Sequence, residues 1–251
     1  MTANIGIDRT SGIALWRQIA DDIRTAIQDG EFAEMRKLPG EMALAGRFGV
    51  NRHTVRAAIA ALQGEGILRP MPGRGTEIIS VRKLSLPISR RTRFSAGLGA
   101  QSRRPEMSFI ASGKGVADHE IARALQIAHG APCIVLETLG LADGVPVSLA
   151  KHHFPADRFE GIDQHFLRER SITKAFLALG VPDYLRKSTE ISGRLADENE
   201  RGWLKLAAGA VVLEAVAVNT DTDGVPVQFS RTRFAASRVS LHVGDDLQAG
   251  M

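Results

Sequence analysis

A five-residue motif, Asp-Gly-Val-Pro-Val, occurs twice in this chain, at Asp143–Val147 and again at Asp223–Val227. Asp-Gly is a strong signal for a two-residue β-hairpin loop, because both residues accept the positive φ angles that such a loop needs. The similarity continues beyond the motif, where Phe154 matches Phe234. The second half of the chain is therefore predicted to contain two similar long hairpins that pair in one antiparallel sheet.

Apolar and helical patterns flank these hairpins. The leading strands are predicted at Cys133–Leu141 and Val211–Val218, which are largely apolar. Apolar residues recur at helical spacing in the stretches His119–Leu125, Ser171–Leu179 and Ala196–Leu206. Helices grouped on one side of an antiparallel sheet form an α+β domain, and this is the fold class that we expect here.

Small and polar side chains are predicted to share one face of this sheet. Successive residues of a strand point to opposite faces, so Ser148 and His152 lie on one face of the first hairpin. The equivalent face of the second hairpin carries Gln228, Ser230 and Thr232. Such residues in place of bulky apolar ones favour a ligand cavity, although a sheet face exposed to water would carry the same residues.

Other residues could bind an anion at this cavity. Ser171 is suited to cap a helix whose first N–H groups are free. Further donors for a phosphate or phosphonate would be supplied by Arg93, Ser95, His152 and Arg186. Plain helix capping by Ser171 is compatible with this role. The complete candidate set for a small anionic effector is Arg93, Ser95, Ser148, His152, Ser171, Arg186, Gln228, Ser230 and Thr232.

The chain offers no pattern typical of an enzyme or a cofactor protein. It has no Gly-rich phosphate loop, no Gly-x-Ser-x-Gly turn and no spacing typical of metal ligands. His152 and His153 are adjacent, so on a strand they point to opposite faces and cannot share a metal. The single cysteine, Cys133, lies in an apolar run and is expected in the core. Without a long apolar stretch or a signal peptide, a cytoplasmic protein is expected.

The first part of the chain carries helical patterns at close intervals. The first, Leu15–Gln28, is followed by Gly30, and a short second helix is expected to begin at Glu41. The glycine-containing turn Phe48–Asn51 leads into a third helix, Arg52–Gly64, which Asn51 is suited to cap. Strands are then predicted at 66–70 and 76–79, joined by a small basic hairpin.

This order of elements is typical of a protein that reads DNA. Arg52 and Arg56 are left on the outer side of the third helix, and arginine can form a bidentate pair with guanine in the major groove. Arg74 in the hairpin could reach the minor groove. The candidate DNA-contacting residues are Lys37, Asn51, Arg52, His53, Thr54, Arg56, Gly73 and Arg74.

The uneven charge of the chain supports a polyanionic partner. The net charge is only +4, but the stretch from Arg36 to Arg74 has seven basic and two acidic residues. The stretch from Arg82 to Arg104 has seven more basic residues and no acidic one. A solvated basic surface would have the same composition, so the helix pattern carries the prediction.

Residues 10–80 resemble the DNA-binding domain of the GntR family of regulators. The resemblance is carried by Leu38–Glu41, Phe48–Arg56, Leu62–Gly66 and Gly73–Thr76. It implies a winged helix-turn-helix at residues 1–80, with base-reading arginines at Arg52 and Arg56. Family members usually carry Ser or Thr and then Arg at the positions of Gly40 and Met42, so some contact with the phosphate backbone is in doubt.

The following residues resemble the UTRA ligand-sensing domain of the HutC branch of this family, which is similar in fold to chorismate lyase. The stretches Val145–Pro155, Ser171–Thr173, Asp183–Arg186 and Arg231–Phe234 are similar to regulators of phosphonate metabolism, which control carbon–phosphorus lyase operons. In sugar-phosphate-sensing members, two arginines and a glutamate hold the effector. The matching positions here are Thr138, Gly140 and Ala150, so an amino-sugar phosphate is not expected to bind in that way.

The resemblance implies an α+β protein of three parts. These are a winged helix-turn-helix at 1–80, a basic linker at 81–95, and an effector-binding and dimerisation domain with an antiparallel sheet at 96–251. We expect a homodimer that binds double-stranded operator DNA and represses genes for phosphonate uptake or degradation, without enzyme activity, cofactor or membrane partner. The alternatives are a HutC-type repressor of amino-acid, sugar, fatty-acid or other carbon and nitrogen metabolism, a DNA-binding protein without an effector, and a chorismate-lyase-like enzyme.

Overall fold

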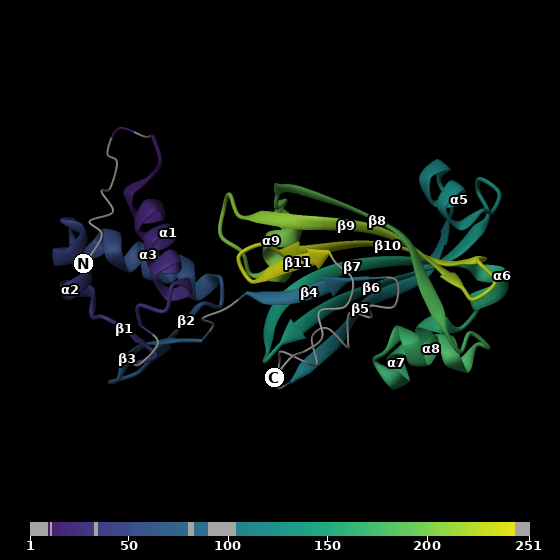
Figure 1. Cartoon of the computed structure of the whole chain (residues 1–251), viewed down its shortest axis with the longest axis horizontal. Helices are drawn as coiled ribbons and strands as arrows, with labels where there is room; N and C mark the ends of the chain where they lie inside the picture. The colour runs from purple at the N-terminus through teal and green to yellow at the C-terminus, as the bar shows by residue number, and fades with distance from the viewer. Residues whose placement is uncertain (1–9, 11, 33–34, 80–82, 90–103, 244–251) are drawn as a thin grey trace. The chain divides into compact units, whose positions relative to one another are not determined.

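The computed structural model describes residues 10, 12–32, 35–79, 83–89 and 104–243. The chain divides into two compact units, one extending to Lys83 and the other comprising almost all residues from Leu84 onward (Figure 1). Within the described residues, no helix has the length and apolar character that crossing a membrane requires.

The first unit packs helices against a small sheet. Its helices are α1 (Leu15–Gln28), α2 (Glu41–Phe48) and α3 (Arg52–Gly64). Its strands are β1 (Lys37–Leu38), β2 (Leu68–Met71) and β3 (Gly75–Ile78), in the antiparallel order β1-β3-β2. These bounds agree with the sequence prediction for the first and third helices, and they confirm the winged helix-turn-helix order.

The core of this unit is built by helical periodicity. Ile19 and Ile23 of α1 meet Val55 and Leu62 of α3, and all are almost completely buried. The polar contact between these helices is also buried, since Arg24 Nη2 lies 2.8 Å from Oε2 of Glu65. Apolar packing and this ion pair together fix α3 against α1 and leave the opposite face of α3 in solvent.

The second unit is organised around a six-stranded antiparallel sheet of order β5-β6-β7-β10-β9-β8. The strands of the sheet are β5 (Pro105–Val116), β6 (Pro132–Ala142), β7 (Val145–Pro155), β8 (Tyr184–Leu195), β9 (Val211–Asp221) and β10 (Pro226–Ala235). The helices are α5 (His119–Leu125), α6 (Ala156–Phe159), α7 (Ile162–Glu169), α8 (Ile172–Ala178) and α9 (Glu198–Leu204). The two predicted hairpins are β6–β7 and β9–β10, and they join through β7 and β10 as expected.

The repeat is larger than the two hairpins. Each half of the sheet runs strand, helix, strand, strand, so that β5-α5-β6-β7 corresponds to β8-α9-β9-β10. The same backbone bond precedes each hairpin, because Ala117 N donates to Ala131 O and Ala196 N donates to Ala210 O, both at 2.8 Å. The second unit is therefore an internal duplication whose halves meet between β7 and β10.

Helices cover both faces of the sheet, and the prediction that they group on one side is wrong. On one face, α7 and α8 pack their apolar residues on Leu136 and Phe154. On the other face, α5 packs Ile121 and Leu125 against Phe229, and α9 contacts β7. The strands are apolar on both faces at their ends, so each face acquires a helix layer. Cys133 is buried in the α5 cluster, as predicted.

Part of the predicted linker belongs to the second unit. Within residues 81–95, the stretch Leu84–Ile88 forms strand β4, which pairs in parallel with β11 (Val239–Val243). Leu86 and Val239 then pack on Val147 and Phe234 of the sheet. The apolar Leu-Ser-Leu-Pro-Ile stretch is therefore a strand in the fold and not a connector.

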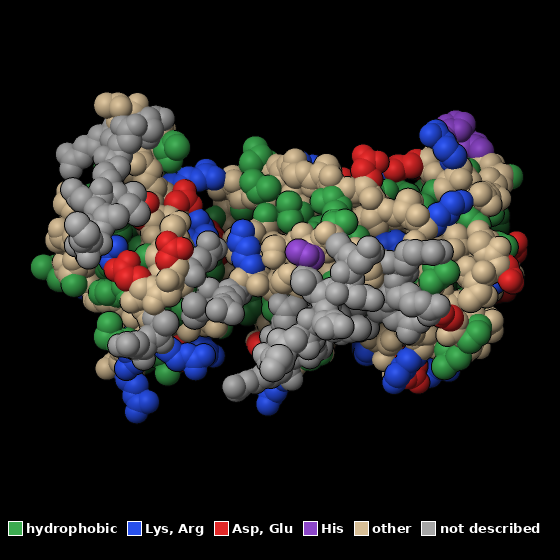
Figure 2. All heavy atoms as spheres, viewed as in Figure 1, with side chains coloured by type: hydrophobic (Ala, Val, Ile, Leu, Met, Phe, Trp, Pro, Cys, Tyr) green, Lys and Arg blue, Asp and Glu red, His purple; other side chains and the backbone are tan. Residues whose placement is uncertain are grey.

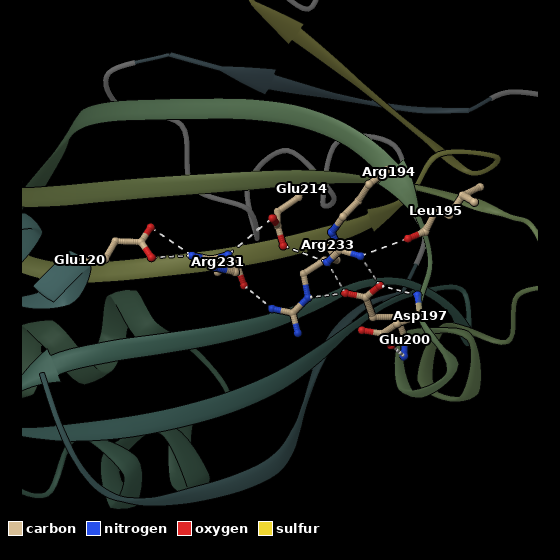
Figure 3. A network of polar contacts seen from close by, with 8 residues as sticks. All are labelled: Glu120, Arg194, Leu195, Asp197, Glu200, Glu214, Arg231 and Arg233. Carbon is tan, nitrogen blue, oxygen red and sulfur yellow. Dashed lines mark hydrogen bonds and ion pairs between the residues drawn. The ribbon is translucent and has the colours of Figure 1, made fainter. Parts of the chain in front are cut away.

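A network of ion pairs runs across the face of the sheet that carries α5 and α9 (Figure 3). Arg231 of β10 bonds to Glu120 of α5 and lies near Glu214 of β9, which also accepts from Arg194 of β8. Arg194 then binds Glu200 of α9, whose side chain is almost completely buried.

Glu200 is the most enclosed member of this network. Arg194 Nη2 lies 2.6 Å from its Oε1, Arg233 Nε lies 3.2 Å from the same oxygen, and Asp197 N donates to Oε2 at 3.0 Å. Burial alone would raise the pKa of Glu200, but the bonds from Arg194 and from the backbone of Asp197 outweigh it and hold the pKa below the ordinary value. Glu200 thus anchors α9 to the sheet.

The variant Glu200→Gln is expected to lower the free energy of unfolding of the second unit by about 2 kcal/mol, because it leaves the partly buried Arg194 and Arg233 without their buried carboxylate. The measurement is urea unfolding of the full chain. Because the folded pKa is lowered, the contribution of Glu200 is present above the ordinary value of 4.5 and is lost as the pH falls through the folded pKa. Glu198→Gln, at an exposed position of the same helix, is the control. Equal stability of the two variants would contradict an anchoring role.

Candidate DNA-reading helix and candidate ligand cavity

Helix α3 begins with a side-chain cap. The Asn51 side chain accepts a hydrogen bond from Thr54 N at 2.8 Å and lies 3.0 Å from the Thr54 hydroxyl. Gly49 supplies the left-handed turn between α2 and α3, with φ of 61°. This is the cap and the turn that the sequence predicts, and the cap uses the side-chain oxygen of Asn51, leaving its amide group for other contacts.

The two candidate base-reading arginines lie together on the exposed face of α3. Arg52 and Arg56 both bond to Glu41 of α2, at 2.5 Å from Arg52 Nε and 2.9 Å from Arg56 Nη2. The bonds from Arg56 and then from Arg52 lower the pKa of Glu41 to about 2. Glu41 therefore stays ionised over the whole physiological range and holds both guanidinium groups side by side.

The wing is the β2–β3 hairpin. Its turn closes with a bond from Arg74 N to Met71 O at 2.8 Å, and Gly73 and Gly75 adopt φ of 71° and 88°. Arg74 at the turn, His53 at the start of α3 and Lys37 on β1 are all exposed. Basic and acidic side chains are interspersed on the visible face of this unit in Figure 2. A contact between these exposed residues and DNA remains a prediction.

The two departures from the family pattern are visible at the start of α2. Gly40 occupies the N-cap position, where no side-chain cap bond forms, and Met42 is 71% exposed. A serine cap and an arginine at these positions would satisfy a helix N–H group and reach a phosphate. Arg36 lies before β1 and outside α2, so within the helix it replaces neither the serine cap nor the arginine.

The second unit contains a cavity of about 110 Å³ on the sheet face that α7 and α8 also cover. This volume holds several water molecules or a small ligand. The candidate effector residues Ser148, His152, Ser171, Arg186, Gln228, Ser230 and Thr232 all line it. Arg93 and Ser95 lie outside the described residues. Alternation along β7 and β10 thus brings the predicted residues together as expected.

The cavity exists because small residues replace bulky ones at the centre of the sheet. Ala150, Ala215 and Ala217 line it beside the serines of β7 and β10. Apolar residues close one side, with Leu86 and Phe234 in the cluster that β4 and β11 form on the sheet. A tightly packed core would fill such a space, so the open volume makes this face of the sheet a candidate ligand site.

His152 lies in the cavity wall with both ring nitrogens occupied. Its Nδ1 is 2.9 Å from Gln228 Nε2, and its Nε2 is 3.2 Å from the Thr138 hydroxyl. Burial, with smaller contributions from His153 and Arg233, lowers the pKa of His152 to about 3, so the ring is neutral. Both ring nitrogens thus have partners within the protein, and His152 orients Gln228. A contact between His152 and an effector stays a prediction. His153 points to the other face, where its ring centroid lies 5.9 Å from that of Phe229.

Arg186 is the principal cation of the cavity. Its Nε atom is buried and has no hydrogen-bond partner among the described residues. Burial lowers the pKa of its guanidinium group, because charge is disfavoured away from water. Arg170 also lines the cavity, whereas no aspartate or glutamate does in the described part of the chain. This arrangement favours an anionic ligand.

Several residues of the cavity were not among the sequence candidates. Thr138 and Asn219 are buried polar residues of β6 and β9, and Arg170 follows α7 in a left-handed conformation. The Tyr184 hydroxyl lies 2.9 Å from that of Thr173 at the cavity wall. Neither Thr138 nor Asn219 stands out in the sequence, because Thr138 follows Glu137 and Asn219 begins the polar run Asn219–Asp221. Ser171 caps α8 through Lys174 N at 3.3 Å.

Comparisons with known proteins agree with both parts of the chain. The family model described as UTRA domain matches residues 100–240, and the model for bacterial regulatory proteins of the gntR family matches residues 15–78. The chain is 49% identical to an uncharacterized HTH-type transcriptional regulator of Rhizobium meliloti, over 94% of this chain and 97% of that protein.

Two further proteins share one name. The chain is 32% identical to the protein named "Probable transcriptional regulator PhnF" of Escherichia coli, over 77% of this chain and 80% of that protein. The crystal structure of PhnF from Mycobacterium smegmatis is similar with a TM-score of 0.62 and 25% identity, over 92% of this chain and 100% of that one. These likenesses confirm the α+β fold with helix-turn-helix helices followed by an antiparallel sheet.

Replacing Arg56 with Ala is expected to weaken binding to the preferred DNA site about 10-fold to 100-fold and to relax base preference, because a bidentate contact to guanine is lost. The measurement is fluorescence anisotropy with DNA from upstream of the gene and with a random duplex. Arg123→Ala removes the same charge from the exposed side of α5 and should leave affinity unchanged. Unchanged affinity of the Arg56 variant would show that Arg56 does not contact the bases.

Glu41→Gln is expected to raise affinity for random DNA and to reduce the ratio of specific to random affinity. The substitution deletes a charge that repels phosphate, and it frees Arg52 and Arg56 from their common carboxylate. Titrations at two salt concentrations separate the two effects, since only the phosphate contribution depends strongly on salt. A variant that keeps the wild-type ratio would show that Glu41 does not orient the arginines.

Proposed function

This chain belongs to the GntR family of bacterial regulatory proteins, in the HutC-type branch that carries a UTRA domain, and from this premise we propose that it is a ligand-responsive repressor of genes for phosphonate uptake or degradation. Regulation of transcription through DNA binding follows from the family. The effector, the sign of regulation and the controlled genes are our proposal.

The observation that carries the proposal is Arg186, whose buried Nε has no hydrogen-bond partner among the described residues, in a cavity whose described lining contains no carboxylate. A buried cation without a counter-ion is costly, and a bound anion removes that cost. Hydroxyl groups of Ser148, Ser230 and Thr232 surround the same space and can donate to oxyanion oxygens. The favoured effector is therefore a small anion.

A phosphonate is favoured over an amino-sugar phosphate. Thr138 and Ala150 line the cavity where sugar-phosphate-sensing relatives are expected to carry charged residues. The similarity to PhnF supports the same choice. A phosphate ester shares the oxyanion chemistry and remains within the proposed class.

The proposed mechanism uses a homodimer in the cytoplasm. Two copies of α3 lie in successive major grooves of a palindromic operator, with Arg52 and Arg56 on base edges and Asn51, His53, Thr54 and Lys37 on phosphates. The wing residues Gly73 and Arg74 approach the minor groove. Effector binding stabilises a dimer geometry whose half-site spacing does not fit the operator, and the repressor dissociates.

Residues up to about 80 are proposed to read DNA, and the unit that begins at Leu84 to bind effector and to form the dimer. A regulator of amino-acid or other carbon and nitrogen metabolism would use the same parts with another ligand. Thermal-shift screening of the full chain with phosphonates, phosphate esters and imidazole carboxylates distinguishes these ligands, because a bound ligand raises the unfolding temperature.

Arg186→Gln is expected to weaken phosphonate binding by roughly 30-fold or more, because it deletes the buried cation that receives the anion. The measurement is isothermal titration with ethylphosphonate, together with ligand-induced release of DNA in the anisotropy assay. Lys187→Gln is the matched control, since Lys187 is the next residue and is exposed outside the cavity. Equal binding by wild type and by the Arg186 variant would overturn the effector site, and effector-strengthened DNA binding would overturn repression.

A further inference from the structure

A row of polar side chains crosses the cavity from one edge strand of the sheet toward its centre. Arg186 of β8 is directly opposite Asn219 of β9, and Asn219 is opposite Gln228 of β10. A β-bulge follows Arg186 in its pairing with β9, and another precedes Gln228 in its pairing with β9. Bulges re-aim the neighbouring side chains, and here they flank the row on both sides.

The hydrogen bonds of the row run in one direction. Asn219 Nδ2 donates to Gln228 Oε1 at 2.6 Å, and Gln228 Nε2 lies 2.9 Å from His152 Nδ1. The neutral His152 accepts at Nδ1, so its proton is on Nε2, which lies 3.2 Å from the Thr138 hydroxyl. The side-chain amides of Asn219 and Gln228 therefore both donate their N–H groups in the direction of His152.

This direction leaves two groups without a partner at the other end. Asn219 is 5% exposed, and its Oδ1 atom has no hydrogen-bond partner among the residues that the structure describes. The donor Arg186 Nε is also buried and likewise has no hydrogen-bond partner among these residues. Buried polar groups in native proteins are satisfied with few exceptions, so an unsatisfied acceptor beside an unsatisfied donor in a cavity points to a ligand that supplies both.

We propose that the effector is a small oxyanion that carries a hydroxyl group, with the oxyanion accepting from Arg186 and the hydroxyl donating to Asn219 Oδ1. This rests on the proposed function and specifies its ligand. Side chains directly opposite each other on antiparallel strands have Cβ atoms about 5 Å apart, so the hydroxyl is within a few bonds of the charged group. The oxyanion is a phosphonate, a phosphate ester or a carboxylate.

A hydroxyl fits this position better than an ammonium group. An ammonium group at Asn219 would lie beside Arg186, and the described lining contains Arg170 but no carboxylate to balance a further positive charge. A neutral donor satisfies the amide oxygen without that repulsion. The cavity is thus suited to hydroxylated anions and not to zwitterions.

The experiment compares ligands of equal size by isothermal titration into the full chain. Propylphosphonate, 2-hydroxyethylphosphonate and 2-aminoethylphosphonate differ only in a terminal methyl, hydroxyl or ammonium group. The hydroxyl compound is expected to bind at least about tenfold more tightly than the other two, because only it satisfies the buried acceptor. Propyl phosphate with 2-hydroxyethyl phosphate, and butyrate with 3-hydroxypropionate, give the same comparison for the other two head groups.

The variant Asn219→Ala tests the acceptor directly. It is expected to abolish the preference for the hydroxyl compound while leaving the affinity for its methyl counterpart unchanged. Thr220→Ala, on the adjacent residue that does not line the cavity, should keep the preference. If Asn219→Ala does not fold, the nitrogen-15 shifts of His152 in the wild type serve instead, with Nε2 protonated and Nδ1 unprotonated as the expected result.

The outcomes separate this inference from the function on which it rests. Equal affinity for the methyl and hydroxyl compounds of every head group overturns the inference and leaves an anionic effector in place. A direct bond between Arg186 and Asn219 would give this result. The opposite tautomer of His152 also overturns it, since the Asn219 N–H group would then face the ligand. Hydroxyl preference among carboxylates alone supports the inference and overturns the phosphonate assignment. No binding by any of these anions overturns both.

Discussion

The antiparallel pairing of β7 with β10 is the interaction on which the second unit depends. Ser230 lies opposite His152 and Thr232 opposite Ala150, so this one pairing fixes the register of the cavity residues from both hairpins. A shift by one residue would send these side chains to the other face and bring Arg231 and Arg233 into the cavity. The two faces of β10 thus differ, since one lines the cavity and the other carries the ion-pair network.

Elements with local signals could be predicted from the sequence. The first Asp-Gly turn, the Asn51 cap and the period of α3 each depend on neighbouring residues, and the structure has them where the sequence places them. The second Asp-Gly lies in a longer connection between Asp221 and Pro226, where only Gly224 has a positive φ. Strand alternation was also sufficient to bring Ser148, His152, Gln228, Ser230 and Thr232 to one cavity. Their contact with a ligand is a separate matter, which alternation does not address.

The rest depends on partners that are distant in the chain. Strand β4 pairs with β11, which lies near the other end of the sequence, so residues 84–88 have the local appearance of a linker. Asn219 gains its role from cross-strand neighbours and two bulges that single-strand patterns do not reveal. The clamp of Glu41 on Arg52 and Arg56 likewise joins two helices, whereas the sequence associates Glu41 only with the start of its own helix.

The internal duplication has a consequence for how a ligand is oriented. The two halves of the sheet are related by an approximate twofold axis between β7 and β10, and the cavity extends across this axis. The side chains do not follow the symmetry. The facing pair Arg186 and Asn219 of β8 and β9 occupies the place that the facing pair Met107 and Gly140 has in β5 and β6. Two halves of the same fold thus enclose a cavity whose two sides differ in chemistry, so the proposed ligand, which has two different ends, would bind in one orientation. The two similar halves together form the cavity, and the few residues that differ between them make its two sides chemically different.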